Sequence, residues 1–443
     1  MDKITQTIEK AKQDQVRLID LQFTDFFGAI KVVTIPADKL EDALRAGIWF
    51  DGSSIQGFAR IYESDMFLAP DTDTYAVLPW TKDTNAPTAR LICDVHNADG
   101  EPFDGCPRTI LKRVLKEAEE LGYSYNTGPE LEFFLFPKDE DGIPIVESKG
   151  NSAYFTLPLD ETYDIRRDIV EALIEFGIEP EMSHPEVAWN QHEIDFKYGG
   201  ALKTADNAIS FKTVVKSIAN QYGYYATFMP KPIFGVNGSG MHVHQSLFKG
   251  SDNVFYDPSD AYKLSPVAKS FIAGQLKYIK EIAAITSPTV NSYKRLTPGY
   301  EAPVYICWAQ RNRSAMIRIP RFTPGREKAV RAELRCPDPS SNPYLCFAAI
   351  LKAGIKGIKE NLTPPAAMEE DVFEFGEEER KLKGVDSLPG SKGEAIQEME
   401  RGSIAKEIFK GAYNDFVSVH KAEWDKYRIQ VSDWELDYYL EQL

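Results

Sequence analysis

The chain has 443 residues, of which 43% are hydrophobic and 27% are charged, a composition that excludes a disordered, collagen-like or coiled-coil protein. Its 67 acidic and 51 basic residues give a net charge of −16, which argues against nucleic-acid binding because that function needs a basic surface. We expect a soluble, cytoplasmic protein that neither spans nor binds a membrane, since the sequence contains no signal peptide, no membrane-spanning run and no disulfide pattern.

The N-terminal part of the chain is predicted to form a small mixed domain. Gly28 lies between two strand-like runs and indicates a hairpin there. The segment 97–109 is rich in Gly, Pro and Asp, so we place a domain boundary in it and divide the chain into domains 1–105 and 106–443. The predicted elements of the first domain are a helix at the N-terminus, strands over 16–23 and 28–36, a helix over 37–46, and strands over 74–80 and 90–95.

The second domain begins with an amphipathic helix that starts at Pro107 and ends at Gly122. Three more helices are predicted over 164–176, 210–222 and 267–285. Strand-like runs between them come in adjacent groups rather than in strict alternation with helices, which favours an α+β fold. The segment 364–380 is acidic and is predicted to be an exposed loop.

Charged residues interrupt otherwise apolar strands in a regular way. In GPELEFFLF, Glu130 and Glu132 are two residues apart, so a strand directs both carboxylates to one face. Two carboxylates in so apolar a strand repel each other and are poorly solvated, and a bound cation removes both problems. An exposed pair on an edge strand is the alternative.

The same alternation recurs in three further segments, QHEIDFKY, MHVHQSL and RAELR. It places on single strand faces the polar residues Gln191, Glu193, Asp195, His242, His244, Ser246, Arg331, Glu333 and Arg335. If these faces line one cavity, its oxygen-rich ligands suit two or more Mg²⁺ or Mn²⁺ ions rather than zinc. Arginines in YKRL, NRSAMIRIP and RAELR, segments without a helical pattern, would neutralise phosphate oxygens in a phosphoryl transfer.

Long motifs in this sequence resemble one known family, type I glutamine synthetase. They run in order through the chain: FDGSSI, GPELEFFLF, HPEVAWNQHEID, KPIFGVNGSGMHVHQS, NSYKRLTPGYEAP and NRSAMIRIP. The resemblance implies a ligase (glutamate–ammonia ligase) that joins ammonium to L-glutamate with ATP as co-substrate, through γ-glutamyl phosphate. It also implies an N-terminal β-grasp domain, a catalytic domain with a curved antiparallel half-barrel sheet backed by helices, and a homo-dodecamer of two hexameric rings with active sites shared between subunits.

Matched residue by residue, the resemblance assigns roles to particular side chains. One metal ion goes to Glu132, Glu186 and Glu193, and the second to Glu130, His242 and Glu333. The resemblance assigns the binding of glutamate to Asn237, Gly238, Arg295, Glu301, Arg313 and Arg335. It assigns the binding of ATP to Glu181, Tyr198, His244, Ser246, Arg313, Arg318, Lys328 and Arg331. Asp51 is implied as the base that deprotonates ammonium, Glu301 as a flap carboxylate, and Arg313 and Arg335 as further catalytic residues.

Regulation is implied by two positions. Phe373 stands where the enterobacterial branch of the family carries a tyrosine that becomes adenylylated, so the sequence resembles the branch of Gram-positive bacteria and archaea. In that branch an arginine after the DGSS loop mediates feedback by glutamine, and Arg60 matches its position. Control by small nitrogen-regulatory proteins is a further possibility in this branch.

Two other functions compete with ammonia ligation. A γ-glutamyl–polyamine or other amine ligase of the same superfamily would keep the metal and ATP residues, but the intact DGSS and PGYE segments favour ammonia. A non-catalytic assembly protein on the same scaffold would be expected to lose metal ligands, and all six positions are filled.

Overall fold

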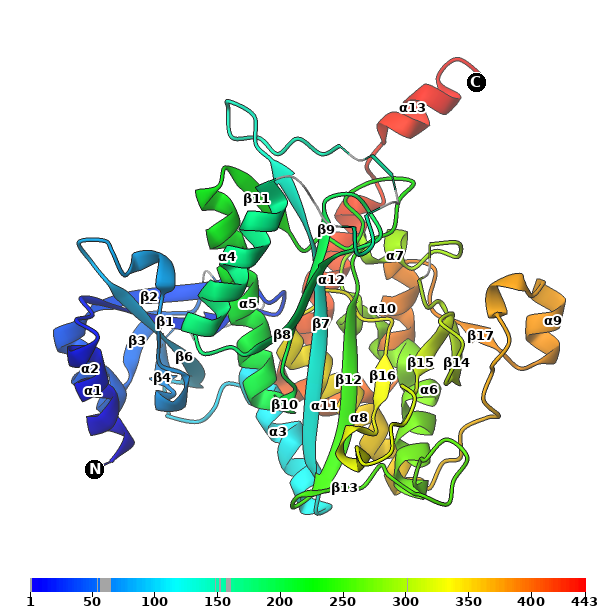
Figure 1. Ribbon diagram of the computed structural model, residues 1–443, viewed down its shortest axis with the longest axis horizontal. Helices are drawn as coiled ribbons and strands as arrows, with labels where there is room; N and C mark the ends of the chain where they lie inside the picture. Colours follow the sequence, from blue (N-terminus) through cyan, green and yellow to red (C-terminus); the bar gives the residue numbers. More distant parts are fainter. Residues whose placement is uncertain are drawn as a thin grey trace.

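A computed structural model describes residues 2–53, 55, 65–147, 149–150, 153–156, 161–300 and 302–443. In this part of the chain the strands form two sheets, a small one near the N-terminus and a large one in the centre of the molecule (Figure 1). The two sheets and the helices around them confirm the α+β class expected from the sequence.

The small sheet has the strand order β2-β1-β6-β4-β3, with β5 paired to β6, within the described residues. Strands β1 and β6 run parallel, and the other pairs are antiparallel. The hairpin predicted at Gly28 is confirmed, and Gly28 has a φ of +76° that favours glycine. The elements are α1 (Lys3–Gln13), β1 (Leu18–Thr24), β2 (Ile30–Pro36), α2 (Leu40–Ala46), β3 (Ile48–Asp51), β4 (Asp65–Pro70), β5 (Ala76–Val77) and β6 (Thr88–Asn97).

The large sheet has the strand order β17-β14-β15-β16-β12-β7-β9-β8 in the described part of the chain, with β10 and β11 paired to β7 and β13 paired to β12. Its strands are β7 (Ser124–Pro137), β8 (Pro180–Pro185), β9 (Gln191–Phe196), β10 (Gly199–Gly200), β11 (Tyr224–Thr227), β12 (Met241–Lys249), β13 (Asp252–Asn253), β14 (Tyr305–Ala309), β15 (Ala315–Arg318), β16 (Ala332–Leu334) and β17 (Asp386–Ser387). The long central strands β7 and β12 carry most of the predicted site (Figure 1).

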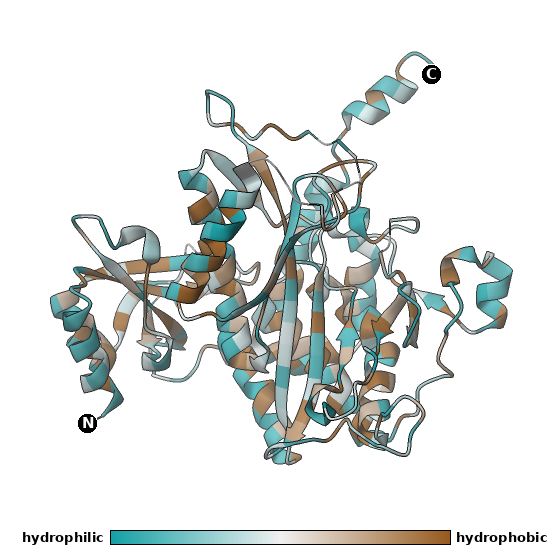
Figure 2. Ribbon diagram, viewed as in Figure 1, coloured by the Kyte–Doolittle hydropathy of each residue, from teal (hydrophilic) through white to brown (hydrophobic). Residues whose placement is uncertain are grey.

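Helices cover the large sheet on one side and form the core with it. The helices of this part of the chain are α3 (Pro107–Glu120), α4 (Glu161–Glu175), α5 (Ala201–Gln221), α6 (Pro266–Thr286), α7 (Ser292–Arg295), α8 (Pro343–Lys359), α9 (Glu377–Leu382), α10 (Lys392–Arg401), α11 (Ile404–Phe409), α12 (Tyr413–Tyr427) and α13 (Asp433–Tyr439). Helices α9 and α13 have no buried residues and take no part in this core. Polar and apolar residues alternate along them (Figure 2), as expected for helices with one buried face. The predicted helices correspond to α3, α4, α5 and α6, although α5 begins earlier than expected.

The apolar face of β7 packs on these helices. Leu131, Phe133 and Leu135 are fully buried, and the Phe133 ring meets Phe211 of α5 edge-on at a centroid distance of 6.2 Å. Burial of side chains this size stabilises the fold by about 1.5–3 kcal/mol each. Because successive residues of a strand face opposite ways, this packing directs Glu130 and Glu132 away from the helices.

Two local predictions were wrong. The segment 364–380 is not a plain exposed loop: it contains the start of α9, and Val372 is fully buried against the core. The apolar residues between its carboxylates supply the contacts that hold it in place. The segment around Arg295 lacks a helical sequence pattern, yet Ser292–Arg295 forms the single turn of α7, which is too short to show periodicity.

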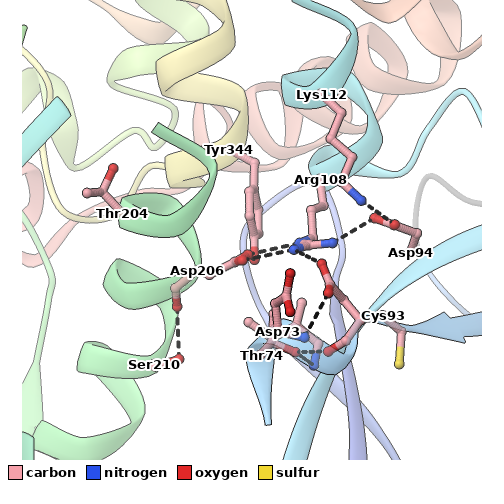
Figure 3. A network of polar contacts seen from close by, with 12 residues as sticks. Asp73, Thr74, Cys93, Asp94, Arg108, Lys112, Thr204, Asp206, Ser210 and Tyr344 are labelled. Atoms are coloured by element: carbon pink, nitrogen blue, oxygen red, sulfur yellow. Dashed lines mark hydrogen bonds and ion pairs between the residues drawn. The ribbon is translucent and has the colours of Figure 1, made fainter. Parts of the chain in front are cut away.

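A buried network of charges joins the two sheets at the start of α3 (Figure 3). The Arg108 guanidinium lies 2.7 Å from Asp71, which follows β4, 3.1 Å from Asp94 of β6, and 2.9 Å from Asp206 of α5. Lys112 pairs with Asp94, and the Tyr344 hydroxyl donates to Asp206 at 2.6 Å. Arg108 therefore holds the small sheet against the helices that pack on the large sheet.

The last helix projects from the body of the molecule (Figure 1), and Trp434 within it is 62% exposed. Among the helices of the described residues, none combines the length and the apolar character needed to cross a bilayer.

Candidate active site

The register of neighbouring strands brings one half of the predicted site together. His242 of β12 lies opposite Glu130 of β7, with 3.2 Å between Nδ1 and the carboxylate. His244 lies opposite Glu333 of β16, and its Nε2 is 2.6 Å from Glu130. The Arg331 guanidinium donates to His244 Nδ1 at 3.0 Å, which leaves the ring proton on Nε2 facing the carboxylate.

Glu333 is the most deeply buried of these carboxylates, with no exposed surface. Its oxygens accept from Arg318 at 2.5 Å and from Arg335 at 2.9 Å, and His242 Nδ1 lies 3.8 Å away. Because two arginines surround a single carboxylate, the group has a net positive charge, which favours an anion beside it.

The other half of the site lies across β7, β9 and β8. Glu132 pairs in register with Glu193, which in turn pairs with His184. His184 Nε2 lies 3.4 Å from Glu193, and its Nδ1 lies 3.5 Å from Glu186, the residue after β8. Gln191 donates to Glu132 at 2.7 Å. Strand alternation does not predict Glu186, because it follows the end of its strand.

These side chains open into a cavity of 330 Å³ on the face of the sheet opposite to the helices. Twelve residues assigned from the resemblance line it: Glu130, Glu132, Glu186, Glu193, Asn237, Gly238, His242, Arg295, Arg313, Arg318, Glu333 and Arg335. The remaining lining residues were given no role: Tyr154, Phe155, Met182, His184, Val187, Gln191, Asp195, Tyr300 and Ala302. The alternation of β9 already indicated Gln191 and Asp195, whereas Tyr154 and Phe155 come from an irregular segment that shows no periodic signal.

Other predicted site residues do not line this cavity or lie outside the described chain, although His244 and Arg331 are linked to it through Glu130. Asp51 lies at the end of β3 in the small sheet and is exposed. Six predicted ATP contacts are described but do not line the cavity: Glu181, Tyr198, His244, Ser246, Lys328 and Arg331. Glu301 and Arg60 lie outside the described residues.

The carboxylates of the cavity suit a divalent cation. Burial, with the nearby Glu186 carboxylate, raises the pKa of Glu132 to about 8, and burial beside Glu130 raises the pKa of Asp195 to about 7. One oxygen of Asp195 is buried without a hydrogen-bond partner. Among the described residues, two clusters have ligand atoms within 4.8 Å of one another, Glu130 with His244 and Glu333, and His184 with Glu193 and Asp195. Mostly oxygen donors fit Mg²⁺ or Mn²⁺.

These raised pKa values predict a pH-dependent effect of metal on stability. In the metal-free protein the stability contributed by Glu132 is present below its unfolded pKa of 4.5 and is lost as the pH rises through about 8, because its carboxylate must then ionise beside Glu186. A cation replaces the proton and removes this cost. We expect Mg²⁺ to raise the thermal unfolding midpoint more at about pH 8.5 than at about pH 6. Equal shifts at both pH values, measured against EDTA-treated protein, would contradict this.

Comparison with known proteins identifies the class of protein. Residues 15–98 match the family described as "Glutamine synthetase, beta-Grasp domain", and residues 104–439 match "Glutamine synthetase, catalytic domain". The chain therefore belongs to the glutamine synthetase family. The expected β-grasp domain and larger catalytic domain with its curved half-barrel sheet are confirmed.

Curated relatives of the chain are glutamine synthetases over nearly its whole length. The protein of Clostridium saccharobutylicum is 53% identical over 435 residues, 98% of this chain and 97% of the relative, and that of Methanosarcina mazei is 52% identical over 438 residues with the same coverage. A solved structure titled "GmaS/ADP complex-Conformation 1" has 31% identity and a TM-score of 0.88, and it covers 98% of this chain and 99% of its own. The predicted function, that of a glutamine synthetase or glutamate–ammonia ligase, is thereby confirmed.

Proposed function

We propose that the cavity binds L-glutamate and the phosphates of ATP and forms γ-glutamyl phosphate, which ammonia converts to L-glutamine. The observation that carries this proposal is the meeting, in one cavity, of buried carboxylates such as Glu132 and Glu333 with the guanidinium groups of Arg295, Arg318 and Arg335. Carboxylates bind divalent cations and arginines bind anions, and phosphoryl transfer from a nucleotide to a carboxylate needs both.

Two groups of residues would hold two Mg²⁺ or Mn²⁺ ions. We assign Glu132, Glu186 and Glu193 to one ion, and Glu130, His242 and Glu333 to the other. When bound, such ions neutralise phosphate oxygens and so lower the barrier to their displacement. The hydrogen bonds from Gln191 to Glu132 and from Arg335 to Glu333 orient these carboxylates.

The arginines and the glycine-rich loop would bind the substrates. Arg295 is held rigidly, because it donates to the backbone carbonyls of Arg335, Cys336 and Pro337 at 2.9–3.2 Å. We place the α-carboxylate of glutamate on Arg295, beside Asn237 and Gly238. Its γ-carboxylate oxygen then attacks the γ-phosphorus of ATP, the bond to the β-phosphate oxygen breaks, and ADP leaves while Arg313 and Arg335 stabilise the transferred charge.

Ammonia addition completes the proposed reaction. Asp51 takes a proton from ammonium, ammonia attacks the acyl carbonyl, the bond to the phosphate oxygen breaks, and the nitrogen passes a second proton to the departing phosphate. Hydrogen bonds from the Ser53 side chain and from the Ser53 N–H, the latter at 2.8 Å, lower the pKa of Asp51 and favour its anionic form, which attracts a cation. Glu301 is proposed to guard the intermediate from water. The remaining ATP contacts proposed are Glu181, Tyr198, His244, Ser246, Arg318, Lys328 and Arg331.

Assembly and location belong to the same proposal. We infer a cytoplasmic homo-dodecamer of two hexameric rings, with domains 1–105 and 106–443 and with active sites shared between subunits. One observation supports sharing: within the described residues, the cavity is lined only by residues beyond the small sheet, so Asp51 of the same chain does not reach it.

A stoichiometric assay tests the proposed reaction. With ATP, Mg²⁺, glutamate and ammonium we expect one phosphate released for each glutamine formed, and little phosphate when glutamate is omitted. Methylamine and a polyamine serve as competing amines. A higher kcat/KM for either of them than for ammonium would favour the amine-ligase alternative and contradict our assignment.

Feedback by glutamine is proposed to depend on Arg60. We expect the substitution Arg60→Ala to weaken inhibition by glutamine while synthesis from glutamate continues. Inhibition curves for both proteins check this, and an unchanged concentration of half-inhibition would exclude a role for Arg60. Phe373 has no hydroxyl, so control by nucleotidylation of that position is not expected.

A further inference from the structure

Lys231 contacts two segments that contribute residues to the cavity, the glycine-rich loop and the segment that ends at Tyr300. The side chain is only 9% exposed. Its ammonium group donates to the carbonyl of Val236, at the start of the glycine-rich loop, and lies 3.8 Å from the centroid of the Tyr300 ring. Tyr300 lines the cavity from the opposite segment.

The position of Lys231 is fixed from its backbone. Its N–H donates to the Asn291 side chain at 2.7 Å, and the Asn291 amide donates back to its carbonyl at 3.0 Å. A Cβ on Gly238 would lie 3.2 Å from Lys231 Cδ, so the loop passes directly over the lysine stem. The Gly238 carbonyl in turn accepts from Gln191, which also holds Glu132.

An aromatic ring is a suitable partner for this ammonium group. Among the described residues, no carboxylate contributes to the pKa shift of Lys231: burial, with the nearby charge of Arg295, lowers its pKa to about 8. The negative face of the Tyr300 ring attracts the cation most strongly where water is excluded. The contact therefore draws Tyr300 toward the glycine-rich loop.

We propose that Lys231 is a positioning residue for the reaction: its ammonium group holds the Val236–Gly238 loop and Tyr300 against each other and so closes the amino-acid end of the cavity. This inference rests on the proposed function. Its consequence is chemical. If the closure loosens, water attacks the carbonyl of γ-glutamyl phosphate, the bond to the phosphate oxygen breaks, and glutamate and phosphate are released with a proton, so ATP is consumed without glutamine.

The test compares Lys231→Met and Tyr300→Leu, which remove the two sides of the contact, with Tyr300→Phe, which keeps the ring. We expect the first two to raise the KM for glutamate by about tenfold, which lies between the values typical of exposed and of desolvated cation–π contacts. The KM for ATP should stay unchanged, and the ratio of phosphate to glutamine should rise above one. Tyr300→Phe should restore the coupling that Tyr300→Leu loses, and the double variant should be no worse than either single variant.

Lys10→Met is the matched control, since it removes a lysine from the ring of Tyr75 at 5.2 Å, far along the chain in α1. The Lys10→Met variant should keep the wild-type ratio of phosphate released to glutamine formed. A wild-type ratio in Tyr300→Leu, equal losses in Tyr300→Phe and Tyr300→Leu, or multiplying effects in the double variant would overturn the inference. Because Tyr300 is only half-buried, its variants decide the matter even if Lys231→Met unfolds. If wild-type protein made no glutamine, the proposed function would fail instead.

Discussion

Replacing Glu132 or Glu333 by glutamine is expected to abolish glutamine synthesis, with a loss of at least about 10²-fold in kcat/KM. Each carboxylate belongs to a different proposed metal site, and glutamine keeps the shape of the side chain while removing the charge that binds a cation. Both residues are more than nine-tenths buried, so a water molecule cannot replace the lost carboxylate oxygen as a ligand of the cation. Activity should be measured over a range of Mg²⁺ concentrations, because a lost ligand weakens binding before it changes chemistry.

The control for this experiment is Glu175→Gln, which removes a surface carboxylate paired with Lys82 at 2.6 Å. An exposed pair contributes about 0–1 kcal/mol, so this variant should keep full activity. The thermal unfolding midpoint of each variant shows whether a loss of activity is caused by the missing carboxylate or by unfolding of the protein. Wild-type activity of Glu132→Gln or Glu333→Gln at limiting Mg²⁺ would show that the ligand assignment is wrong.

Mixing two inactive variants should restore activity if sites are shared between subunits. Asp51→Ala subunits lack the proposed base, and Glu333→Gln subunits lack a metal ligand. When equal amounts are dissociated and reassembled, about one quarter of the sites should combine an intact Asp51 with an intact cavity, as random pairing in a closed ring requires. The specific activity should then approach about a quarter of the wild-type value.

The separate variants, taken through the same dissociation and reassembly, are the controls and should stay inactive. Reassembled wild-type protein sets the recoverable activity. Mass measurement of an affinity-tagged mixture shows whether both variants enter one ring. Mixed rings as inactive as either parent would place the complete site within a single chain.

The strand alternation in the sequence predicted much of the cavity. Glu130, Glu132 and Glu193 point into it because Leu131, Phe133 and Ile194 between them are buried against the helices. Period-two patterning is a strong signal wherever one face of a strand is apolar. The family resemblance added Glu186, whose position after β8 no periodicity marks.

Other features could not be predicted from local sequence. Tyr154 and Phe155 reach the cavity from an irregular segment, and α7 is a single turn, so neither shows a periodic pattern. The 364–380 segment was wrongly predicted to be an exposed loop because its many carboxylates outweighed the apolar Val372, which is buried. Long-range contacts such as that of Lys231 with Tyr300 depend on the fold as a whole, and no local sequence pattern in either segment indicates them.

The charge network at Arg108 has a consequence for how the molecule unfolds. A chain cut between the small sheet and α3 would keep the buried Arg108 and its partner Asp206 but lose Asp71 and Asp94, so the guanidinium would lose two of its three carboxylate partners. Breaking a buried ion pair in this way costs about 3–5 kcal/mol, a large share of the stability of a typical domain. The two parts should therefore melt in one cooperative transition, and neither is suited to expression as an independent fragment.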